Sequence, residues 1–317
     1  MGFFVRRLFV TLLTLFFVSL LGFAAFRLIS GDAALLALGT DATEEQLEVL
    51  RAAMGLDKSF PHQYISWLAQ FLSGNLGTSS RFMGVAISEL ITQRLPVTLS
   101  LAALSFILMI IIAVPVSLFS SKKERSPFDH VVTTCTALTI SVPGFFLGVV
   151  FIWIFGLTVK LFVPGAYIPP DENVRAFVAY LFFPALAIAL PNSALLIKFL
   201  RASIFREFQS DYARTAKSKG ASRFHILTRH VLKNASLPAI TLLGMITADI
   251  LSGSIVIEQV FGIPGIGRLL ITSITMRDYP VIQTLMVYCA FVVVLANTIS
   301  DVILQIIDPR IRIAHKV

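Results

Sequence analysis

Six long apolar stretches, each about the length of a membrane-spanning helix, are the main feature of this 317-residue sequence. They cover residues 8–29, 95–119, 131–155, 177–200, 237–257 and 281–307. A bilayer core of about 30 Å needs about 20 apolar residues of helix, and a helix pairs its own backbone groups inside hydrocarbon. The pattern therefore predicts an all-α, polytopic membrane protein with about six transmembrane helices.

The composition fits a chain that is dissolved in lipid rather than in water. Apolar residues make up 56% of the chain and charged residues only 14%, whereas a soluble domain is about 25% charged. The net charge of +8 lies mainly in the segments between the apolar stretches, so it does not indicate a nucleic-acid partner. The first stretch is longer than the core of a signal peptide, which runs about 7–15 residues, so we expect an uncleaved helix.

Lysine and arginine residues predict the orientation of the chain. With the N-terminus in the cytoplasm, the inside segments carry 17 of the 26 basic residues and the outside segments carry eight. Positive charge favours the cytoplasmic side, so both termini are expected there. The expected parts are an N-terminal tail with the first transmembrane helix (1–30), an extracytoplasmic helical loop (31–94), a core of five transmembrane helices (95–309) with a cytoplasmic loop (201–236), and a cytoplasmic tail (310–317).

The extracytoplasmic loop is predicted to contain two short helices. Thr43 and Gln46 have the spacing of a capping box, and Gly55 ends the helical pattern that follows. A second helix is expected to begin at Pro61. Its apolar face would carry Tyr64, Leu68 and Phe71. The loop is either a packed cap over the membrane part or a docking surface for an external partner, and both interpretations stay open.

The cytoplasmic loop 201–236 is strongly basic and is predicted to form two helices broken at Gly220, with Ser222 capping the second. Its apolar stripe has no obvious place to pack within the chain, which favours a groove on another protein. Binding to anionic lipid and a merely solvated basic face are the alternatives. The stripe consists of Ile204, Phe205, Phe208 and Tyr212.

Residue patterns for catalysis and for cofactor or metal binding are not found in the sequence. It contains no phosphate-binding loop of the Gly-x-x-x-x-Gly-Lys-Ser/Thr type and no serine nucleophile elbow. The glycine-rich run at 262–267 contains a proline and follows a membrane stretch, so a nucleotide role is not expected there. The five histidines are scattered, and Cys135 and Cys289 lie inside apolar runs as packing residues. We therefore expect no catalytic residue, cofactor or metal site.

Asp249 is the clearest ionisable residue inside a predicted span, and such residues are functional candidates by default. It is a candidate for the translocation path; a structural charge pair or a place near the outer interface are the alternatives. Pro143, Pro184 and Pro191 mark either bent helices that line a cavity or simple packing kinks.

Three groups of motifs, in order along the chain, carry a resemblance to a known family. The first comprises GLDK at 55–58, QY at 63–64, WL at 67–68, GNLGTS at 74–79 and RLPVTL at 94–99. The second comprises DYARTAKSKG at 211–220, RH at 229–230, NA at 234–235 and LP at 237–238. The third comprises EQVFGIPGIG at 258–267 and RDYP at 277–280. Together they resemble the dipeptide/oligopeptide/nickel branch of binding-protein-dependent ABC importer permeases, over nearly the whole chain.

The resemblance implies a type I ABC importer permease, which is a transport subunit without an ATPase site or bound cofactor of its own, because partner subunits use the ATP. The implied partners are a second homologous permease subunit, two ATPase subunits on the cytoplasmic side and an extracytoplasmic solute-binding protein. The implied location is the cell membrane of a bacterium or archaeon, which is the inner membrane in a Gram-negative cell. Peptides are the implied cargo, with nickel, glutathione or another small solute as alternatives.

The resemblance also implies two groups of functional residues. The loop around 216–222 would be the coupling helix that sits in an ATPase groove, with Gly220 at its sharp turn. The implied coupling-loop residues are Asp211, Tyr212, Arg214, Thr215, Ala216, Lys219, Gly220 and Ser222. The implied extracytoplasmic motif comprises Glu258, Phe261, Pro264, Gly265, Gly267, Arg277 and Asp278.

Two segments depart from the family pattern. The residues Arg214, Thr215 and Ala216 stand where the superfamily has Glu-Ala-Ala, although Gly220 follows at the expected spacing. Residues 30–33 read Ser-Gly-Asp-Ala where the branch has Pro-Gly-Asp-Pro. The first departure argues against carrying over a charge-specific contact from other branches.

Two other classes of membrane protein are weighed against the importer subunit. A self-contained secondary transporter would need internal repeats and several ion ligands within its spans. A membrane scaffold without transport would leave Asp249 and the bent helices unexplained. Only the importer subunit predicts a stoichiometric ATPase and a second permease.

Overall fold

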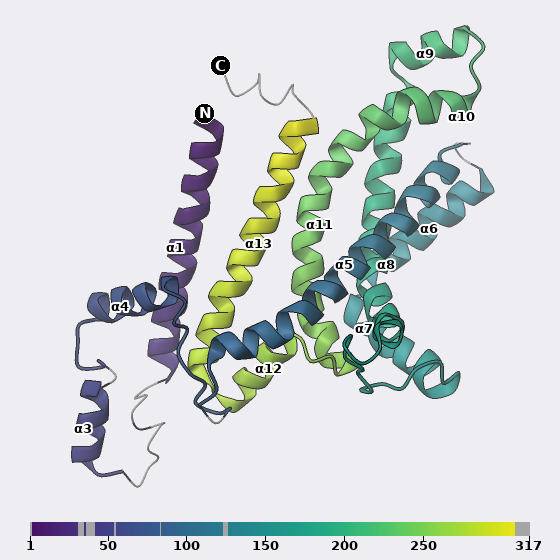
Figure 1. Ribbon diagram of the computed structural model, residues 1–317. Helices are drawn as coiled ribbons and strands as arrows, with labels where there is room; N and C mark the ends of the chain where they lie inside the picture. The colour runs from purple at the N-terminus through teal and green to yellow at the C-terminus, as the bar shows by residue number, and fades with distance from the viewer. Residues whose placement is uncertain are drawn as a thin grey trace. The chain divides into compact units, whose positions relative to one another are not determined.

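The computed structural model describes residues 2–30, 35, 42–53, 55–82, 84–122 and 126–307. The expected tail at 310–317 and most of the Ser-Gly-Asp-Ala departure lie outside the described residues. The regular structure of the described residues is helical (Figure 1). The helices are α1 (Gly2–Ser30), α3 (Glu44–Ala53), α4 (Phe60–Leu72), α5 (Ile87–Ser120), α6 (Pro127–Ser141), α7 (Gly144–Phe151), η1 (Ile152–Thr158), α8 (Val174–Phe208), α9 (Asp211–Ser218), α10 (Arg223–Ile226), η2 (Leu227–Val231), α11 (Leu232–Phe261), α12 (Ile266–Met276) and α13 (Tyr279–Ile307).

Among the described residues, five helices are long and apolar enough to cross a membrane, and a bent pair brings the number to six if it forms one span. The five lie in α1, α5, α8, α13 and the continuous helix from Arg223 to Phe261. The bent pair is α6 followed by α7 and η1. This confirms the prediction of an all-α polytopic protein with about six transmembrane helices.

The third predicted span, 131–155, is bent at Pro143, which is one of the two interpretations that the sequence left open for this proline. The chain bends by 97° between α6 and the α7–η1 segment. Val142 takes an extended conformation (φ −97°, ψ 121°) directly before Pro143, which begins the next helix. Proline disfavours the helical region for the residue that precedes it, so the bend follows from this one dipeptide. Pro184 and Pro191, in contrast, lie inside the continuous helix α8.

The helices divide into two compact units, and the first comprises residues 1–95 and 269–294. Both short helices that were predicted within residues 31–94 are present here. Thr43 and Gln46 exchange the two hydrogen bonds of the capping box at the start of α3, at 3.0 and 3.4 Å. In α4, the buried Tyr64 shares a hydrogen bond of 2.8 Å with Ser19 of α1. The ring of Phe23 lies within 5.6 Å of the Trp67 ring, so aromatic contacts join α4 to α1.

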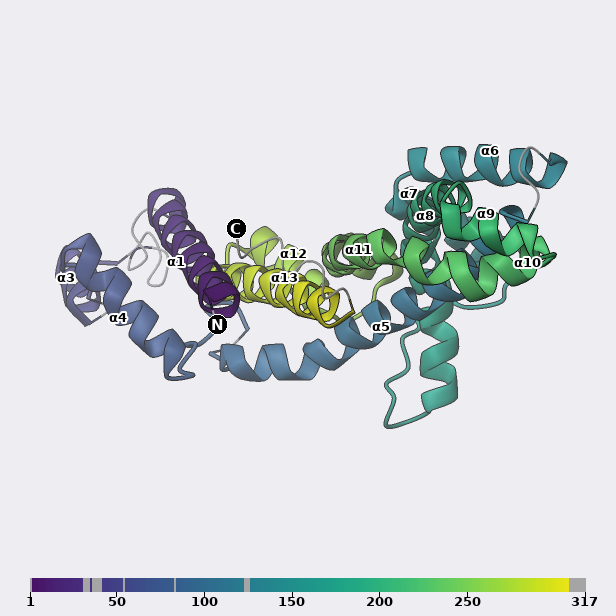
Figure 2. The same cartoon turned by 90° about the horizontal axis from the view of Figure 1, so that it is seen from above.

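The second unit comprises residues 96–268 and 295–317, and α8 is its central helix. It packs against α6, α7 and α11, and Figure 2 shows α6, α8, α9 and α10 gathered together. Small residues on α8 permit this close approach, because helices in lipid associate by packing rather than by a hydrophobic driving force. Fully buried examples are Ala185, Ala187 and Ala189. The packing of α8 positions the cavity beside Asp249 and the Asp129–Arg201 pair, which are described below.

Candidate functional site

Glu258 lies in the last turn of α11, and its side chain is fully buried. Its carboxylate accepts hydrogen bonds from the Thr98 hydroxyl at 2.6 Å and from the backbone amides of Gly267 at 2.7 Å and Arg268 at 3.1 Å. The same hydroxyl accepts from the amide of Ile266 at 2.9 Å. These amides form the first turn of α12, where free N–H groups and the helix dipole favour an anion. We call these five residues the Glu258 cluster.

Two glycines of the same motif leave no room for a side chain beside the Glu258 cluster. A Cβ atom at Gly265 would lie 2.2 Å from the Glu258 carboxyl carbon, and one at Gly267 would lie 2.3 Å from the Cα of Ile255. Both distances are far below van der Waals contact, so each glycine is required by the packing. Phe261 is fully buried and Pro264 is half-buried in the connection to α12. In this structure, residues 258–267 form a tightly bonded joint between two helices.

The last two residues of the predicted motif belong to the first unit. Asp278 is fully buried and accepts hydrogen bonds from the Ser79 hydroxyl and from the amides of Ser80 at 3.2 Å and Arg81 at 3.3 Å. Arg277 is exposed and has a positive φ of 56°. Asp278 therefore fixes the turn after the GNLGTS segment, so two motifs that are far apart in sequence meet at one carboxylate.

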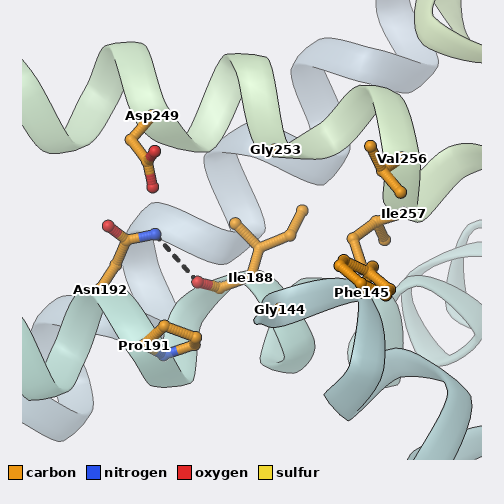
Figure 3. Close-up of a pocket in the computed structure, with 9 residues that line it drawn as sticks. All are labelled: Gly144, Phe145, Ile188, Pro191, Asn192, Asp249, Gly253, Val256 and Ile257. Carbon is orange, nitrogen blue, oxygen red and sulfur yellow. Dashed lines mark hydrogen bonds between the residues drawn. The ribbon is translucent and has the colours of Figure 1, made fainter. Parts of the chain in front are cut away.

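Asp249 lies on α11 at the edge of a cavity of about 200 Å³ between α7, α8 and α11. Figure 3 shows its carboxylate pointing toward Asn192 of α8, whose side-chain amide donates to the Ile188 carbonyl at 3.0 Å. Among the described residues, no hydrogen bond or ion pair reaches the Asp249 carboxylate. The rest of the lining is Gly144, Phe145, Ile188, Pro191, Gly253, Val256 and Ile257. We call this space the Asp249 cavity.

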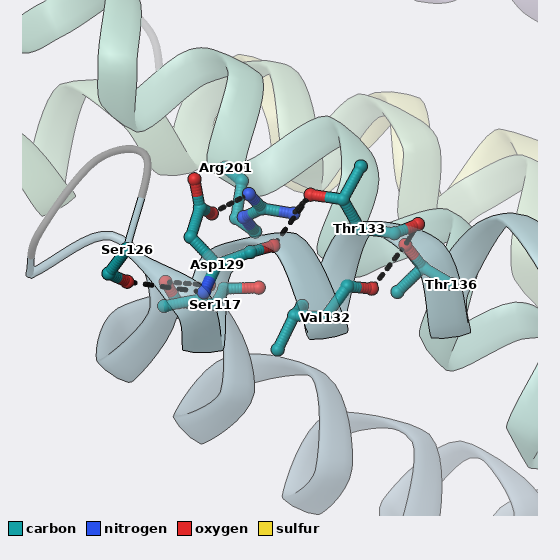
Figure 4. Close-up of polar contacts among 8 residues, drawn as sticks. Ser117, Ser126, Asp129, Val132, Thr133, Thr136 and Arg201 are labelled. Carbon is teal, nitrogen blue, oxygen red and sulfur yellow. Dashed lines mark hydrogen bonds and ion pairs between the residues drawn. The ribbon is translucent and has the colours of Figure 1, made fainter.

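A buried ion pair that the sequence analysis missed joins α6 to α8. Arg201 pairs with Asp129 and donates a second hydrogen bond to the Thr133 hydroxyl at 3.1 Å (Figure 4). The two charged residues are only 8% and 7% exposed. Ser126 caps α6 by accepting from the Asp129 amide at 3.2 Å. Breaking a buried pair leaves an uncompensated charge, so this contact fixes the relative positions of the two helices.

The predicted coupling loop forms two helices that are separated by a turn at Gly220. The turn follows α9, and Gly220 has a φ of +83° with no atom within 4 Å of where its Cβ would be. Ser222 caps α10 by accepting from the His225 amide at 3.3 Å, as the sequence predicts. Ala216 packs partly against the core. The exposed members of the predicted set are Asp211, Tyr212, Arg214, Thr215, Lys219, Gly220 and Ser222.

Part of the apolar stripe before this turn packs within the chain, so the expectation that the stripe has no place to pack there is wrong for Ile204 and Phe208. Ile204 is fully buried, and Phe208 packs against the core beneath the Arg223 guanidinium, 4.8 Å from its ring. The reason is that α8 continues to Phe208 and carries the stripe into the unit. Tyr212 is exposed; desolvation of its phenol raises its pKa, and its hydrogen bond of 2.5 Å to Glu207 raises the pKa further.

A second cavity, of about 560 Å³, lies within the first unit and is lined by several of the motif residues. The side chains of Trp67 and Gln63 on α4 face it, together with residues 75–78. Gln283 lies at the same cavity, and its amide nitrogen is buried without a hydrogen-bond partner among the described residues. No three His, Cys, Asp or Glu side chains in the described part of the chain gather closely enough to hold a metal ion.

Comparison with protein families gives two matches that together cover most of the chain. Residues 113–313 match the family described as binding-protein-dependent transport system inner membrane component. Residues 1–102 match the N-terminal family that accompanies it.

Individual relatives agree with these family matches. A protein of Sinorhizobium fredii, whose name describes a peptide ABC transporter permease, is 35% identical over 307 residues, which is 97% of this chain and 98% of that protein. A Brucella abortus protein named as a peptide transport system permease is 35% identical and covers 93% of this chain and 94% of its own. The oligopeptide transport system permease protein of Bacillus subtilis is 32% identical and covers 97% of this chain and 98% of its own.

Proposed function

The chain belongs to the family of binding-protein-dependent transport system inner membrane components, and from this membership we propose that it forms half of the translocation pathway of an ATP-driven importer of peptides. As a member, it is a multi-pass membrane component of a transport system and works with other components of that system. The relatives described above that are named for peptide transport support peptides as the cargo. Nickel, glutathione or another small solute carried by the same machinery is the alternative.

The proposed complex contains a second homologous permease, two ATPase subunits on the cytoplasmic side and an extracytoplasmic solute-binding protein. The ATPases hydrolyse ATP, and this chain binds none itself. Both termini face the cytoplasm in this proposal, because the inside segments then carry most of the Lys and Arg residues. A self-contained secondary transporter is the runner-up from a different class, and the family membership argues against it.

The observation that carries the proposal is the α9–Gly220–α10 turn. It presents basic, exposed side chains on two short helices that lie beyond the end of α8, where they are free to enter a groove on an ATPase (Figure 1). The segments on both sides of the turn are packed into the second unit: Ala213 of α9 is 3% exposed, and Leu227, which follows α10, is fully buried. A movement imposed on the turn would therefore pass directly to α8 and α11.

Co-purification from the native membrane tests the composition of the complex. A complex of this chain with a second permease and two ATPase subunits supports the importer, and a chain that purifies alone and transports solute without ATP overturns it. The coupling role is tested with Gly220→Val, because a β-branched residue at a φ of +83° costs about 1–3 kcal/mol of backbone strain. We expect ATP-driven uptake to fall about tenfold or more while the ATPase still co-purifies.

Gly84→Val is the matched control for this experiment. Gly84 also has a positive φ, 73°, with no atom near its Cβ position, but it lies in the loop that is expected outside the cytoplasm. Its variant should lose similar stability and keep the ratio of uptake to ATP hydrolysis. Normal uptake by Gly220→Val would show that this turn does not couple the ATPase to transport.

A further inference from the structure

The Asp249 cavity is lined by hydrogen-bond acceptors and by one negatively charged side chain. Its described lining contains no positively charged side chain. Asp249 carries the charge, and the remaining lining residues are glycine, proline or apolar apart from Asn192. A carboxylate inside a membrane span is costly unless it faces water, a partner or a ligand. This carboxylate has no partner among the described residues, so the cavity is complementary to a cation that also donates hydrogen bonds.

Asn192 strengthens this preference because its amide orientation is fixed. The side-chain nitrogen donates to the Ile188 carbonyl at 3.0 Å, and the side chain is only 6% exposed. Its Oδ1 therefore remains as an acceptor, and no described donor reaches it. One turn away, the Ala187 carbonyl lacks the usual amide of residue 191, because Pro191 has no N–H.

The size of the cavity limits what it holds. Its volume of about 200 Å³ is smaller than the roughly 300–1,000 Å³ of a site that encloses a whole small molecule. It therefore fits one end of a cargo molecule rather than all of it. Gly253 lies in the wall with no atom within 4 Å of its Cβ position, which leaves the space beside Asp249 open.

We propose that the Asp249 cavity binds the primary ammonium group at the amino terminus of a peptide during its passage, with the Asp249 carboxylate and Asn192 Oδ1 as acceptors. The inference rests on the proposed function as a peptide importer. A charge-assisted hydrogen bond is stronger than one between neutral groups, and the amino-terminal ammonium is the cationic group that every unmodified peptide shares. Recognition of the amino terminus would therefore hold the cargo without selecting its side chains.

The first test is uptake into proteoliposomes that contain the complete importer and its binding protein. The probe is a defined mixture of radiolabelled tripeptides with free amino termini, which avoids a choice of side chains. We expect Asp249→Asn to lower ATP-driven uptake about tenfold or more, because a charge-assisted contact is lost. The double variant Asp249→Asn with Asn192→Asp returns the carboxylate to the cavity from the other wall and should restore uptake to within about threefold of the wild type.

The outcomes of the uptake test separate the two proposals. Wild-type uptake by Asp249→Asn overturns the ammonium site and leaves the importer intact. No ATP-driven uptake of the mixture by the wild type, with the ATPase present, overturns the peptide assignment and the ammonium site together. Every variant is measured with the same binding protein, so the preference of that protein among the peptides is the same in all assays. Differences in uptake between the variants therefore come from the permease.

A second test needs no substrate and reads the charge of the cavity directly. Gly253→Cys, in a background with Cys135→Ser and Cys289→Ser, places a thiol in the cavity wall beside an intact Asp249. The thiol should react faster with a cationic methanethiosulfonate reagent than with an anionic one, and Asp249→Asn should abolish this preference. Thr241→Cys is the control, because Thr241 is exposed on the same helix but outside the cavity.

This labelling experiment also separates a ligand site from a subunit contact. A thiol that reacts with neither reagent in the assembled importer means that a second permease closes the cavity with its own residues, and the ammonium site is then wrong. A charge preference that persists in Asp249→Asn would equally overturn the proposal.

Discussion

The two carboxylates of α11, Glu258 at its end and Asp249 nine residues earlier, lie in opposite surroundings. Glu258 is fully buried and accepts hydrogen bonds from one hydroxyl and two backbone amides. Asp249 is exposed beside a cavity and receives no hydrogen bond from the described residues. The contrast separates two situations of a carboxylate in a membrane helix: one is bonded into the fold, and the other receives no bond from the part of the chain that the structure describes.

The largest expected effect is on the bonded carboxylate. Glu258→Ala leaves three donors without an acceptor, two of them in buried hydrogen bonds, so we expect a loss of about 3–5 kcal/mol in stability. Glu258→Gln should lose much less, because its amide keeps an acceptor for the α12 amides. Thermal unfolding of the purified complex in detergent measures both. If the Glu258→Ala variant were as stable as the wild type, the hydrogen bonds of Glu258 would not stabilise the fold, and the contrast with Asp249 would be wrong.

A pair of glycines tests the packing around each carboxylate. Gly267→Ala forces a Cβ to within 2.3 Å of backbone and should cost about 1–3 kcal/mol. Gly253→Ala meets no atom within 4 Å, so it should leave stability unchanged or raise it by up to about 1 kcal/mol through helix propensity. If both alanine variants lost the same stability in the same unfolding assay, the space around Gly267 would be no more closely packed than the space around Gly253.

Thr98→Val sharpens the account of the Glu258 cluster. The valine keeps the shape of the side chain but removes the donor to Glu258 and the acceptor for the Ile266 amide. We expect stability to fall by about 1–2 kcal/mol, which is less than for Glu258→Ala, because the amides of Gly267 and Arg268 keep the Glu258 carboxylate as their acceptor. The double variant with Glu258→Ala should be less than additive, and simple additivity would show that the two residues act independently.

The smallest expected effect on stability is that of Asp249→Asn. Because the Asp249 side chain has no partner among the described residues, removing its charge leaves no described group unsatisfied, and the change should stay within about 0.5 kcal/mol. The variant should also elute as an assembled complex in size-exclusion chromatography. A large loss of stability would show that Asp249 is held by a structural contact.

Much of the fold was predictable because its signals are local. Apolar length predicts the spans, and Gly220 with Ser222 predicts the turn between α9 and α10. The bend between α6 and α7 escaped the hydropathy pattern, because both arms are apolar, although Pro143 marked the place.

The missed parts of the candidate site depend on pairing across the chain. Asp129 and Arg201 lie just beyond the ends of predicted spans, where charges were attributed to topology, while the real helices extend past them and bury the pair. The apolar stripe was misassigned for the same reason, since α8 runs on to Phe208. Thr98 belongs to the RLPVTL motif and Ser79 to the GNLGTS motif. Only the tertiary structure shows that their hydroxyls donate hydrogen bonds to the distant carboxylates of Glu258 and Asp278.

The joint at Glu258 also orders events during synthesis of the chain. Thr98 precedes its partner Glu258 by 160 residues, which takes about 8–30 s at roughly 5–20 residues per second. Until α11 and α12 emerge from the ribosome, the hydroxyl of α5 can bond only to its own helix or to transient neighbours. For most of its synthesis, the nascent permease therefore consists of inserted helices that lack the contacts of the Glu258 cluster. A chain that stops before residue 266 would not form these contacts and would be exposed to membrane proteases.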